Sequence, residues 1–205
     1  MIGFHVDKIK TVIFDIGGVL LNIDHDAFPR KLGIERSRVN HVDKQAIEQI
    51  AKEYEIGRIG TEEFFGMMDE IFKGKYTSEK LENAWNAIVV EENSEIIPVV
   101  NAIQARYQTA ILSNTNPAHF QESCDTAAIV KKFSKLYLSF QIGAAKPDPA
   151  AYQYVIRNLS AEPSSLLFID DLAENVAAAM KCGIEGIVFK DASGLQAELR
   201  SRQML

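Results

Sequence analysis

The stretch VIFDIGG, residues Val12–Gly18, determines the fold class of this chain. Its first three residues form a short continuous apolar run, which is typical of a β-strand buried on both faces. The run ends at the carboxylate of Asp15, and two glycines follow after one apolar residue. Similar apolar runs that end in polar residues recur later in the chain. They predict further strands at residues 110–112, 136–138, 166–169 and 186–189.

Helices are expected between these strands. Asp148 followed by Pro149 is typical of an N-cap and a first helical position, and predicts a helix to about Leu159. Another helix is expected from about Ala173 to Gly183, where a glycine suits a left-handed C-cap. Strands that alternate with helices in this way predict an α/β fold with a doubly wound, Rossmann-like parallel sheet.

Residues 23–95 differ from the rest, because they hold several amphipathic helical stripes and no convincing strand. Phe64, Met68 and Phe72, for example, share one helical face. This helical block follows the first strand directly, so it can close over the carboxyl edge of the sheet as a lid. We therefore predict a core domain of residues 1–22 and 96–205 and a helical cap domain of residues 23–95.

Composition and charge exclude several classes of partner. The formal net charge of −6, without a run of Lys or Arg, argues against nucleic-acid binding. No apolar stretch approaches the ~18 residues that cross a bilayer, and Met1–Lys10 lacks the apolar centre of a signal peptide. Cys124 and Cys182 lack metal-ligand spacing and should be unpaired. We expect a cytoplasmic monomer or homodimer without nucleic-acid or membrane partners.

Polar residues follow the predicted strands at the edge where open α/β sheets bind ligands. Asp15, Ser113 and the pair Asp170–Asp171 stand at strand ends, and Lys146 lies in the loop after the third strand. Three carboxylates at one edge would repel one another unless a cation lay among them. Oxygen ligands alone suit Mg²⁺, which commonly accompanies a phosphate. Lys146 and the Ser113 hydroxyl would complete a phosphate cradle.

This set of residues predicts phosphoryl transfer. A carboxylate beside Mg²⁺ and a bound phosphate is positioned as a nucleophile, and an acyl-phosphate divides one hard step into two easier ones. The metal and Lys146 would supply alignment and charge neutralisation. No Cys/His or Ser/His/Asp arrangement rivals this reading, and His119 suits a helix-surface position better than a catalytic one.

Four motifs in this order resemble those of the haloacid dehalogenase-like (HAD) hydrolases, in the subgroup with a helical cap after the first strand. They are residues 14–19 (FDIGGV), 112–114 (LSN), 146–149 (KPDP) and 168–171 (FIDD) with Asn175. The resemblance covers nearly the whole chain and implies a Mg²⁺-dependent phosphatase, a phosphoric monoester hydrolase. Residues 112–116 and 137–139 look most like bacterial hexose-1-phosphate phosphatases and the phosphatase domain of soluble epoxide hydrolases. A sugar phosphate is therefore the favoured small-molecule substrate.

The resemblance also implies a role for each site residue. Asp15 would be the nucleophile, carrying an aspartyl-phosphate, and a metal ligand. Asp171 would be the other carboxylate ligand, with Asp170 close by and acting through water. The backbone carbonyl of Gly17 would be a third protein ligand. The phosphate would be held by Ser113, Asn114 and Lys146, of which Ser113 and Lys146 would also take part in catalysis.

Gly17 departs from the family pattern. The usual first motif has a second aspartate two positions after the nucleophile, which serves as general acid and then as base. At Gly17 a carbonyl can still bind metal, but no side chain can move a proton. Loss of a positioned proton donor typically costs ~10²–10⁴ in rate. Asp24 and His25, at the root of the cap, are candidate substitutes, although both also suit a helix start.

Three other functions fit parts of the pattern. A haloacid dehalogenase also uses an aspartate nucleophile, but it needs no cation, which leaves Asp170–Asp171 without a purpose. A signalling receiver domain combines similar residues, but its acidic pair lies on the first strand and no helical insertion follows. A non-catalytic protein that keeps the phosphate pocket would be consistent with Gly17. Assays of several phosphate esters, with and without Mg²⁺, separate this last alternative from an enzyme.

Overall fold

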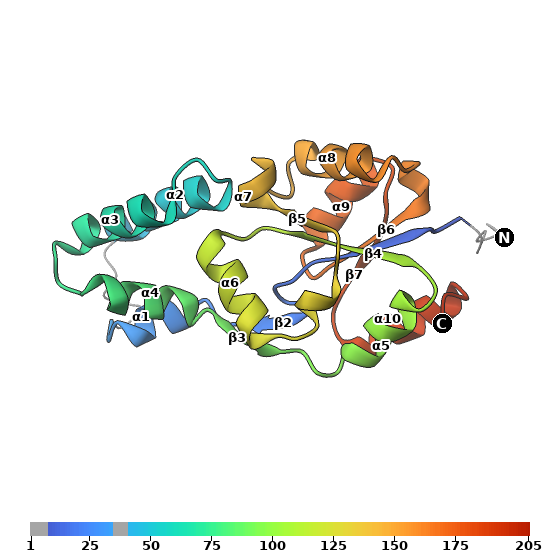
Figure 1. Ribbon diagram of the computed structural model, residues 1–205, viewed down its shortest axis with the longest axis horizontal. Coiled ribbons are helices and arrows are strands. Elements are labelled where there is room, and N and C mark those ends of the chain that lie inside the picture. Colours follow the sequence, from blue (N-terminus) through green and yellow to red (C-terminus); the bar gives the residue numbers. More distant parts are fainter. Residues whose placement is uncertain (1–7, 35–40) are drawn as a thin grey trace.

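A five-stranded parallel β-sheet forms the centre of the protein (Figure 1). The computed structural model describes residues 8–34 and 41–205. The strand order is β5-β4-β1-β6-β7, and every neighbouring pair is parallel. The predicted α/β class is therefore confirmed. The strands are β1 (Thr11–Phe14), β4 (Gln108–Ser113), β5 (Leu136–Leu138), β6 (Leu166–Asp170) and β7 (Glu185–Val188).

Helices cover both faces of this sheet (Figure 1). One face packs against α5 (Ile97–Gln104) and α10 (Ala192–Ser201). The opposite face packs against α8 (Pro149–Leu159) and α9 (Ala173–Lys181). Helix α6 (Pro117–Thr126) follows β4 after a short loop, and α7 (Ser139–Ile142) follows β5 directly.

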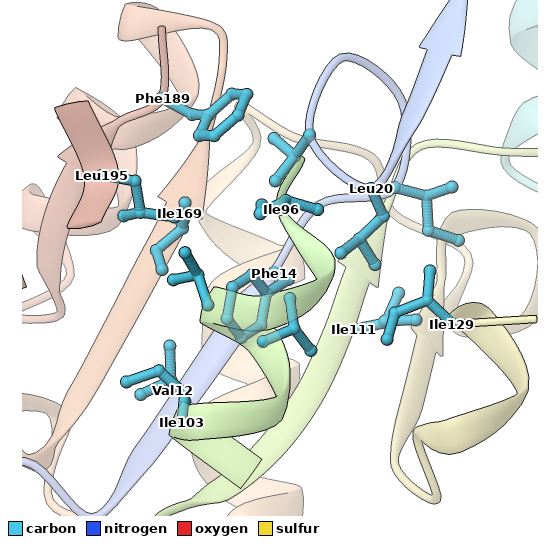
Figure 2. Close-up of a cluster of buried hydrophobic side chains, with 14 of the residues drawn as sticks. Val12, Phe14, Leu20, Ile96, Ile103, Ile111, Ile129, Ile169, Phe189 and Leu195 are labelled. Atoms are coloured by element: carbon cyan, nitrogen blue, oxygen red, sulfur yellow. The ribbon is translucent and has the colours of Figure 1, made fainter. Parts of the chain in front are cut away.

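The central strand β1 is buried on both faces, as its apolar run predicts. Val12 and Phe14 belong to the cluster that includes α5 and α10, and Ile13 belongs to the cluster on the other face. Side chains alternate between the faces of a strand, so three consecutive apolar residues serve both clusters. Figure 2 shows the first cluster, with Phe14 between Ile96 and Ile103 at the two ends of α5.

Four helices form a separate hydrophobic cluster beside the sheet (Figure 1). Tyr54 and Phe64 are stacked at its centre, with ring centroids 4.4 Å apart. Ala118 of α6 belongs to the same cluster, so the helical block packs on the core. The division between core and cap at residues 23 and 95 stays a prediction. The helices are α1 (Ala27–Lys31), α2 (His41–Glu55), α3 (Thr61–Phe72) and α4 (Ser78–Asn86).

The expectation of no strand within residues 23–95 is wrong. β3 (Val89–Glu92) pairs antiparallel with β2 (Leu21–Ile23), and together they form a two-stranded ribbon. In the chain, β2 precedes the four helices and β3 follows them, so the ribbon connects both ends of the helical block to the core. Both strands are short, and β3 shows no clean alternation of buried and exposed residues. The strand therefore depends on its pairing partner, which lies far away in the sequence.

Several local expectations are confirmed. The Asp148 side chain accepts a hydrogen bond from the Ala150 N–H at the start of α8, and Gly183 has a φ of +86° after α9. Cys124 and Cys182 are both unpaired. Within residues 8–34 and 41–205, no helix has the length and apolarity needed to span a membrane. The prediction about a signal peptide rests largely on residues 1–7, which lie outside the described residues.

Candidate active site

Three neighbouring strands end in polar residues at one edge of the sheet. Asp15 directly follows β1, Ser113 ends β4 and Asp170 ends β6. Because β1 lies between β4 and β6, the three residues meet, as the sequence predicted. Asp15 is 7% exposed, Ser113 3% and Asp170 0%. A buried polar set at the carboxyl edge of a parallel sheet occupies the usual ligand-binding position of such folds.

Lys146 lies between two of these carboxylates. Its Nζ is 2.8 Å from Oδ2 of Asp15 and 2.6 Å from Oδ2 of Asp170, and its side chain is 1% exposed. Burial by itself lowers the pKa of Lys146, but the two carboxylates outweigh burial and the pKa is raised. Lys146 therefore remains charged and links the ends of β1 and β6.

Asn114 fixes the backbone of Lys146. Its Oδ1 accepts a hydrogen bond from the Lys146 N–H and its Nδ2 donates one to the Lys146 carbonyl, both at 2.8 Å. Both polar atoms of the Asn114 side chain are thus engaged with backbone. Its backbone N–H and the second hydrogen of Nδ2 are the donors that remain for a phosphate.

The carboxylate of Asp170 is fully used by other protein groups. Oδ1 accepts from the Leu172 N–H at 2.9 Å and from Asn175 Nδ2 at 3.0 Å, while Oδ2 accepts from Lys146 Nζ. Asn175 is held in turn, because its carbonyl accepts a hydrogen bond from the Tyr152 hydroxyl at 2.8 Å. This network makes Asp170 the anchor of Lys146 and leaves little capacity for direct metal binding.

Asp171 completes a group of three carboxylates. One oxygen from each of Asp15, Asp170 and Asp171 lies within 4.8 Å of the others. Burial raises the pKa of Asp15 to about 7, with Lys146 opposing the rise and Asp170 adding to it. Burial, together with the charge of Asp170, also raises the pKa of Asp171. Such a group is stabilised by a hard divalent cation, and the oxygen-only donor set fits Mg²⁺.

Gly17 and Gly18, which follow Asp15 after one residue, differ in the backbone and side-chain constraints on them. Gly18 has a φ of +72°, and a Cβ there would overlap the carboxylate of Asp171, so a side chain is excluded. Gly17 has no left-handed φ, and a Cβ there would lie 3.4 Å from Cγ2 of Ile23. Within the described residues no hydrogen bond reaches the Gly17 carbonyl, which leaves that oxygen available as a ligand.

Neither candidate substitute for the missing acid is well suited to the role. The Asp24 carboxylate pairs with Arg30 at 2.6 Å, and this contact lowers the pKa of Asp24. A carboxylate held in its charged form is a poor proton donor. Oδ1 of Asp24 also accepts the Asp26 N–H, which is the helix-start role that the sequence offered as its alternative. His25 is exposed to solvent.

His119 is half-buried rather than fully exposed on the surface of its helix. Its ring stacks on Trp85 of α4 at 4.8 Å, and its Nε2 lies 2.9 Å from the Trp85 carbonyl oxygen. Burial lowers the pKa of His119 to about 4, so the ring is neutral and acts as a packing contact between α6 and the helical block. Trp85 itself lies in the core of that block.

Sequence reasoning missed two supporting residues. The Ser139 hydroxyl accepts a hydrogen bond from the Thr115 N–H at 2.9 Å and donates one to the Thr115 carbonyl at 2.8 Å. These two bonds connect the start of α7 to the loop after β4. Ser139 directly follows a predicted strand, so the pattern that indicated Ser113, a polar residue at the end of an apolar run, also applies to Ser139. Tyr152, which supports Asn175, lies on an apolar helical stripe and carries no such signal.

Hard oxygen donors beside a buried, charged lysine suit a phosphate group bound together with a divalent cation, and the sheet carries them at its ligand edge. The class is therefore that of doubly wound α/β proteins with an acidic site at the carboxyl edge. More particularly, the chain belongs to the haloacid dehalogenase-like hydrolases, whose family profile matches residues 9–183. The resemblance inferred from the motifs is confirmed.

Similar proteins are known from Bacteroides thetaiotaomicron. The chain is 28% identical to its D-ribitol-5-phosphate phosphatase over 200 residues, which cover 93% of this chain and 97% of the relative. A crystal structure of a HAD family enzyme from this organism has a TM-score of 0.83 at 26% identity, over 91% of this chain and 98% of that one. The same enzyme in complex with magnesium and inorganic phosphate has a TM-score of 0.78 at 27% identity, with the same coverage.

Proposed function

We propose that this protein is a Mg²⁺-dependent phosphatase that hydrolyses a small phosphorylated metabolite through an aspartyl-phosphate on Asp15. The observation that carries the proposal is the Lys146 ammonium held between Asp15 and Asp170, with the Asp171 carboxylate in the same group. Phosphoryl transfer asks for alignment and positive charge, and this arrangement offers both. Family membership supports the reaction class. The name of the bacterial relative supports a sugar or sugar-alcohol phosphate as substrate.

Mg²⁺ would be held by the carboxylates of Asp15 and Asp171 and by the carbonyl of Gly17. Asp170 would reach it only through water, because its own oxygens accept hydrogen bonds from Lys146, Asn175 and a backbone N–H. When bound, the ion supplies positive charge that neutralises the carboxylates and the phosphate.

The reaction would take place in two steps. A carboxylate oxygen of Asp15 attacks the phosphorus, and the bond to the alcohol oxygen breaks. The alcohol takes its proton from solvent, since Gly17 offers none. Water then attacks the phosphorus of the aspartyl-phosphate, which releases phosphate and regenerates Asp15. The hydroxyl of Ser113, the backbone N–H of Asn114 and the ammonium of Lys146 would hold the phosphate oxygens throughout.

The helical block of residues 23–95 would act as the cap domain over a core of residues 1–22 and 96–205. Its contacts with α6, through Ala118 and His119, support this division. The partner would be a free small phosphate ester. In keeping with the net charge of −6, no nucleic acid or membrane is proposed as a partner, and the enzyme would act in the cytoplasm as a monomer or homodimer.

Phosphate release from a panel of phosphate esters, with and without Mg²⁺, tests the proposal. The wild type should turn over at least one sugar or sugar-alcohol phosphate only with Mg²⁺. Asp15→Asn, which is nearly isosteric, should keep the circular dichroism spectrum and lose turnover. Retained turnover in that variant, after deamidation is excluded, would remove Asp15 from the nucleophile role. Phosphate binding without turnover of any ester would instead favour the non-catalytic protein.

A further inference from the structure

The first turn of α6 is the place where the helical block meets the segment that follows β4. α6 begins at Pro117, and Asn116 just before it is the N-cap of the helix. Asn116 ends the segment that starts with Ser113 and Asn114, two of the proposed phosphate contacts. In Figure 1, α6 lies on the side of the sheet nearest to the four helices of the block. A contact from the block to this turn is therefore only a few residues away from the proposed phosphate contacts.

Two helices of the block contact this turn at consecutive residues. The hydroxyl of Tyr54, in α2, accepts a hydrogen bond from the Ala118 N–H at 3.2 Å. The ring of His119 stacks on Trp85, in α4, with ring centroids 4.8 Å apart and ring planes 12° apart. Because the two contacts come from different helices, together they restrain both the position and the rotation of the block relative to α6.

The hydrogen bonds of His119 define which ring nitrogen carries the proton. Asn116 Oδ1 accepts the His119 N–H at 3.0 Å, so the atom that lies 3.2 Å from His119 Nδ1 is Asn116 Nδ2, which can only donate. Nδ1 therefore accepts, and the ring proton lies on Nε2, 2.9 Å from the Trp85 carbonyl oxygen. Burial lowers the pKa of His119 to about 4, which agrees with a neutral ring. One neutral tautomer thus links the N-cap of α6 to the end of α4.

The end of α4 carries two buried polar atoms that lack partners. Within residues 8–34 and 41–205, Trp85 Nε1 and Asn86 Oδ1 are buried and have no hydrogen-bond partner. Such atoms destabilise the position that they occupy, because they have given up hydrogen bonds to water. The docked position of this helix end therefore depends on the contacts that hold it, and His119 supplies both a hydrogen bond and a stacked ring there.

We propose that His119 is a positioning residue for the phosphatase reaction, whose neutral ring holds the helical block docked on α6, beside the phosphate-binding segment 113–116. The proposal rests on the phosphatase function proposed above. The ring bonds to Asn116 and to Trp85, so it acts through the position of the block and not on the reacting atoms. A docked cap excludes water from the site and completes it. Loss of the His119 contacts lowers turnover in proportion to the docked fraction.

Two substitutions separate the hydrogen bonds of His119 from its packing. His119→Phe keeps a flat ring that can stack on Trp85, but it removes both hydrogen bonds of the imidazole. His119→Gln removes the ring but keeps an amide donor near the position of Nε2, so it should recover part of the loss. Gln121→Ala is the matched control, because Gln121 is exposed on α6 and bonds to Asp125 of the same helix.

Trp85 is the only tryptophan of the chain, so its fluorescence reports the docking of α4 directly. Quenching of this fluorescence by acrylamide should increase in His119→Phe, increase less in His119→Gln and stay unchanged in Gln121→Ala. kcat/KM for ribitol 5-phosphate should fall by roughly 3- to 10-fold in His119→Phe, which is the scale of one neutral hydrogen bond. The inhibition constant of inorganic phosphate should stay unchanged, because the proposed phosphate contacts belong to the core.

Three results would overturn the proposal. Quenching and kcat/KM at wild-type values in His119→Phe would mean that only the packing of the ring matters. A loss in His119→Gln as large as that in His119→Phe would mean that the bond to the Trp85 carbonyl contributes nothing. Weaker inhibition by phosphate, in step with kcat/KM, would mean that His119 supports the phosphate-binding segment and not the block.

Thermal melts of the variants exclude unfolding as the cause of a loss. Failure of the wild type to hydrolyse any ester would refute the phosphatase function instead. The quenching of Trp85 needs no turnover and would still test the docking, so the two failures are distinct.

Discussion

The substitution Gly17→Asp tests whether the site lacks its own proton donor. It places a carboxyl group two positions after Asp15, where the family usually has its acid. The backbone accepts the change, because Gly17 has no left-handed φ and its Cβ would meet only Ile23, at 3.4 Å. Ile23 is 39% exposed and can shift toward solvent. The neighbouring Gly18 could not accept a side chain, since its Cβ would overlap Asp171.

Two magnitudes follow from this geometry. A Gly→Ala change at a compatible φ reduces the conformational entropy of the unfolded chain and so stabilises the folded protein by about 0.4–1 kcal/mol. The displacement of Ile23 opposes this gain by a small amount. The free energy of unfolding should therefore change by less than about 1 kcal/mol in Gly17→Ala. A positioned proton donor contributes about 10²–10⁴ in rate when the leaving group needs one. Gly17→Asp should therefore raise kcat/KM for phosphates of primary alcohols by up to about 10²-fold, and hardly at all for aryl phosphates.

The assay measures kcat/KM over a graded series of leaving groups, from primary alcohols to phenols. Wild type, Gly17→Ala, Gly17→Asn and Gly17→Asp are compared. Gly17→Asn fills the same volume without a titrating proton, so the difference between the Asp and Asn variants isolates proton transfer. In the wild type, kcat/KM should rise steeply as the alcohol becomes more acidic, and this slope should flatten in Gly17→Asp.

A flat series in the wild type, when the chemical step is shown to limit, would refute the reasoning. It would mean that another group already protonates the leaving alcohol. A gain in Gly17→Asn equal to that in Gly17→Asp would also refute it, because volume rather than proton transfer would then be responsible.

Further expectations concern the metal, the lysine and the root of the cap. Excess chelator should abolish phosphatase activity and Mg²⁺ should restore it; full activity in chelator would contradict the metal-assisted mechanism. Asp171→Asn should weaken Mg²⁺ binding, measured by calorimetry, and should lower activity in parallel. Lys146→Met leaves two buried carboxylates without their cation, so it should lower the free energy of unfolding, measured in urea, by about 3–5 kcal/mol. The control Lys131→Met, at an exposed position, should not change this free energy. Asp24→Asn should leave kcat/KM unchanged for every ester, because its carboxylate is engaged with an arginine; a selective loss with primary alcohol phosphates would identify it as the missing acid.

The strand ends could be predicted from the sequence because their signal is local. Val12–Phe14 and the other apolar runs locate the strands, and in a parallel sheet every carboxyl end reaches the same edge. The spatial order of the strands is not local, yet it alone places Asp15 between Ser113 and Asp170. The sequence analysis could expect these residues to lie close together because its four motifs occur in the same order as in the HAD family.

Contacts between distant segments account for the errors. The separate roles of Asp170 and Asp171 are not among these errors, because the family resemblance implied them; the structure adds that Asp170 accepts hydrogen bonds from Lys146 and Asn175. The residues next to His119 in the sequence are those of an exposed helical position, and its partial burial comes from stacking on Trp85, which lies 34 residues earlier in the chain. β3 forms because a partner strand lies beside it. Each error concerns a residue whose environment is supplied by chain many positions away.

The charge balance at the carboxyl edge gives a reason why a bound metal ion, Lys146 and the proposed nucleophile Asp15 would depend on one another. Asp15, Asp170 and Asp171 carry three negative charges when ionised, and Lys146 compensates only one of them. Under this balance burial raises the pKa of Asp15, which disfavours the ionised form of the proposed nucleophile. Lys146 cannot correct this alone, because Asp170 shares its ammonium. A divalent cation beside Asp15 would favour the ionised carboxylate, so the ion proposed to neutralise the phosphate would also keep the proposed nucleophile in its reactive form.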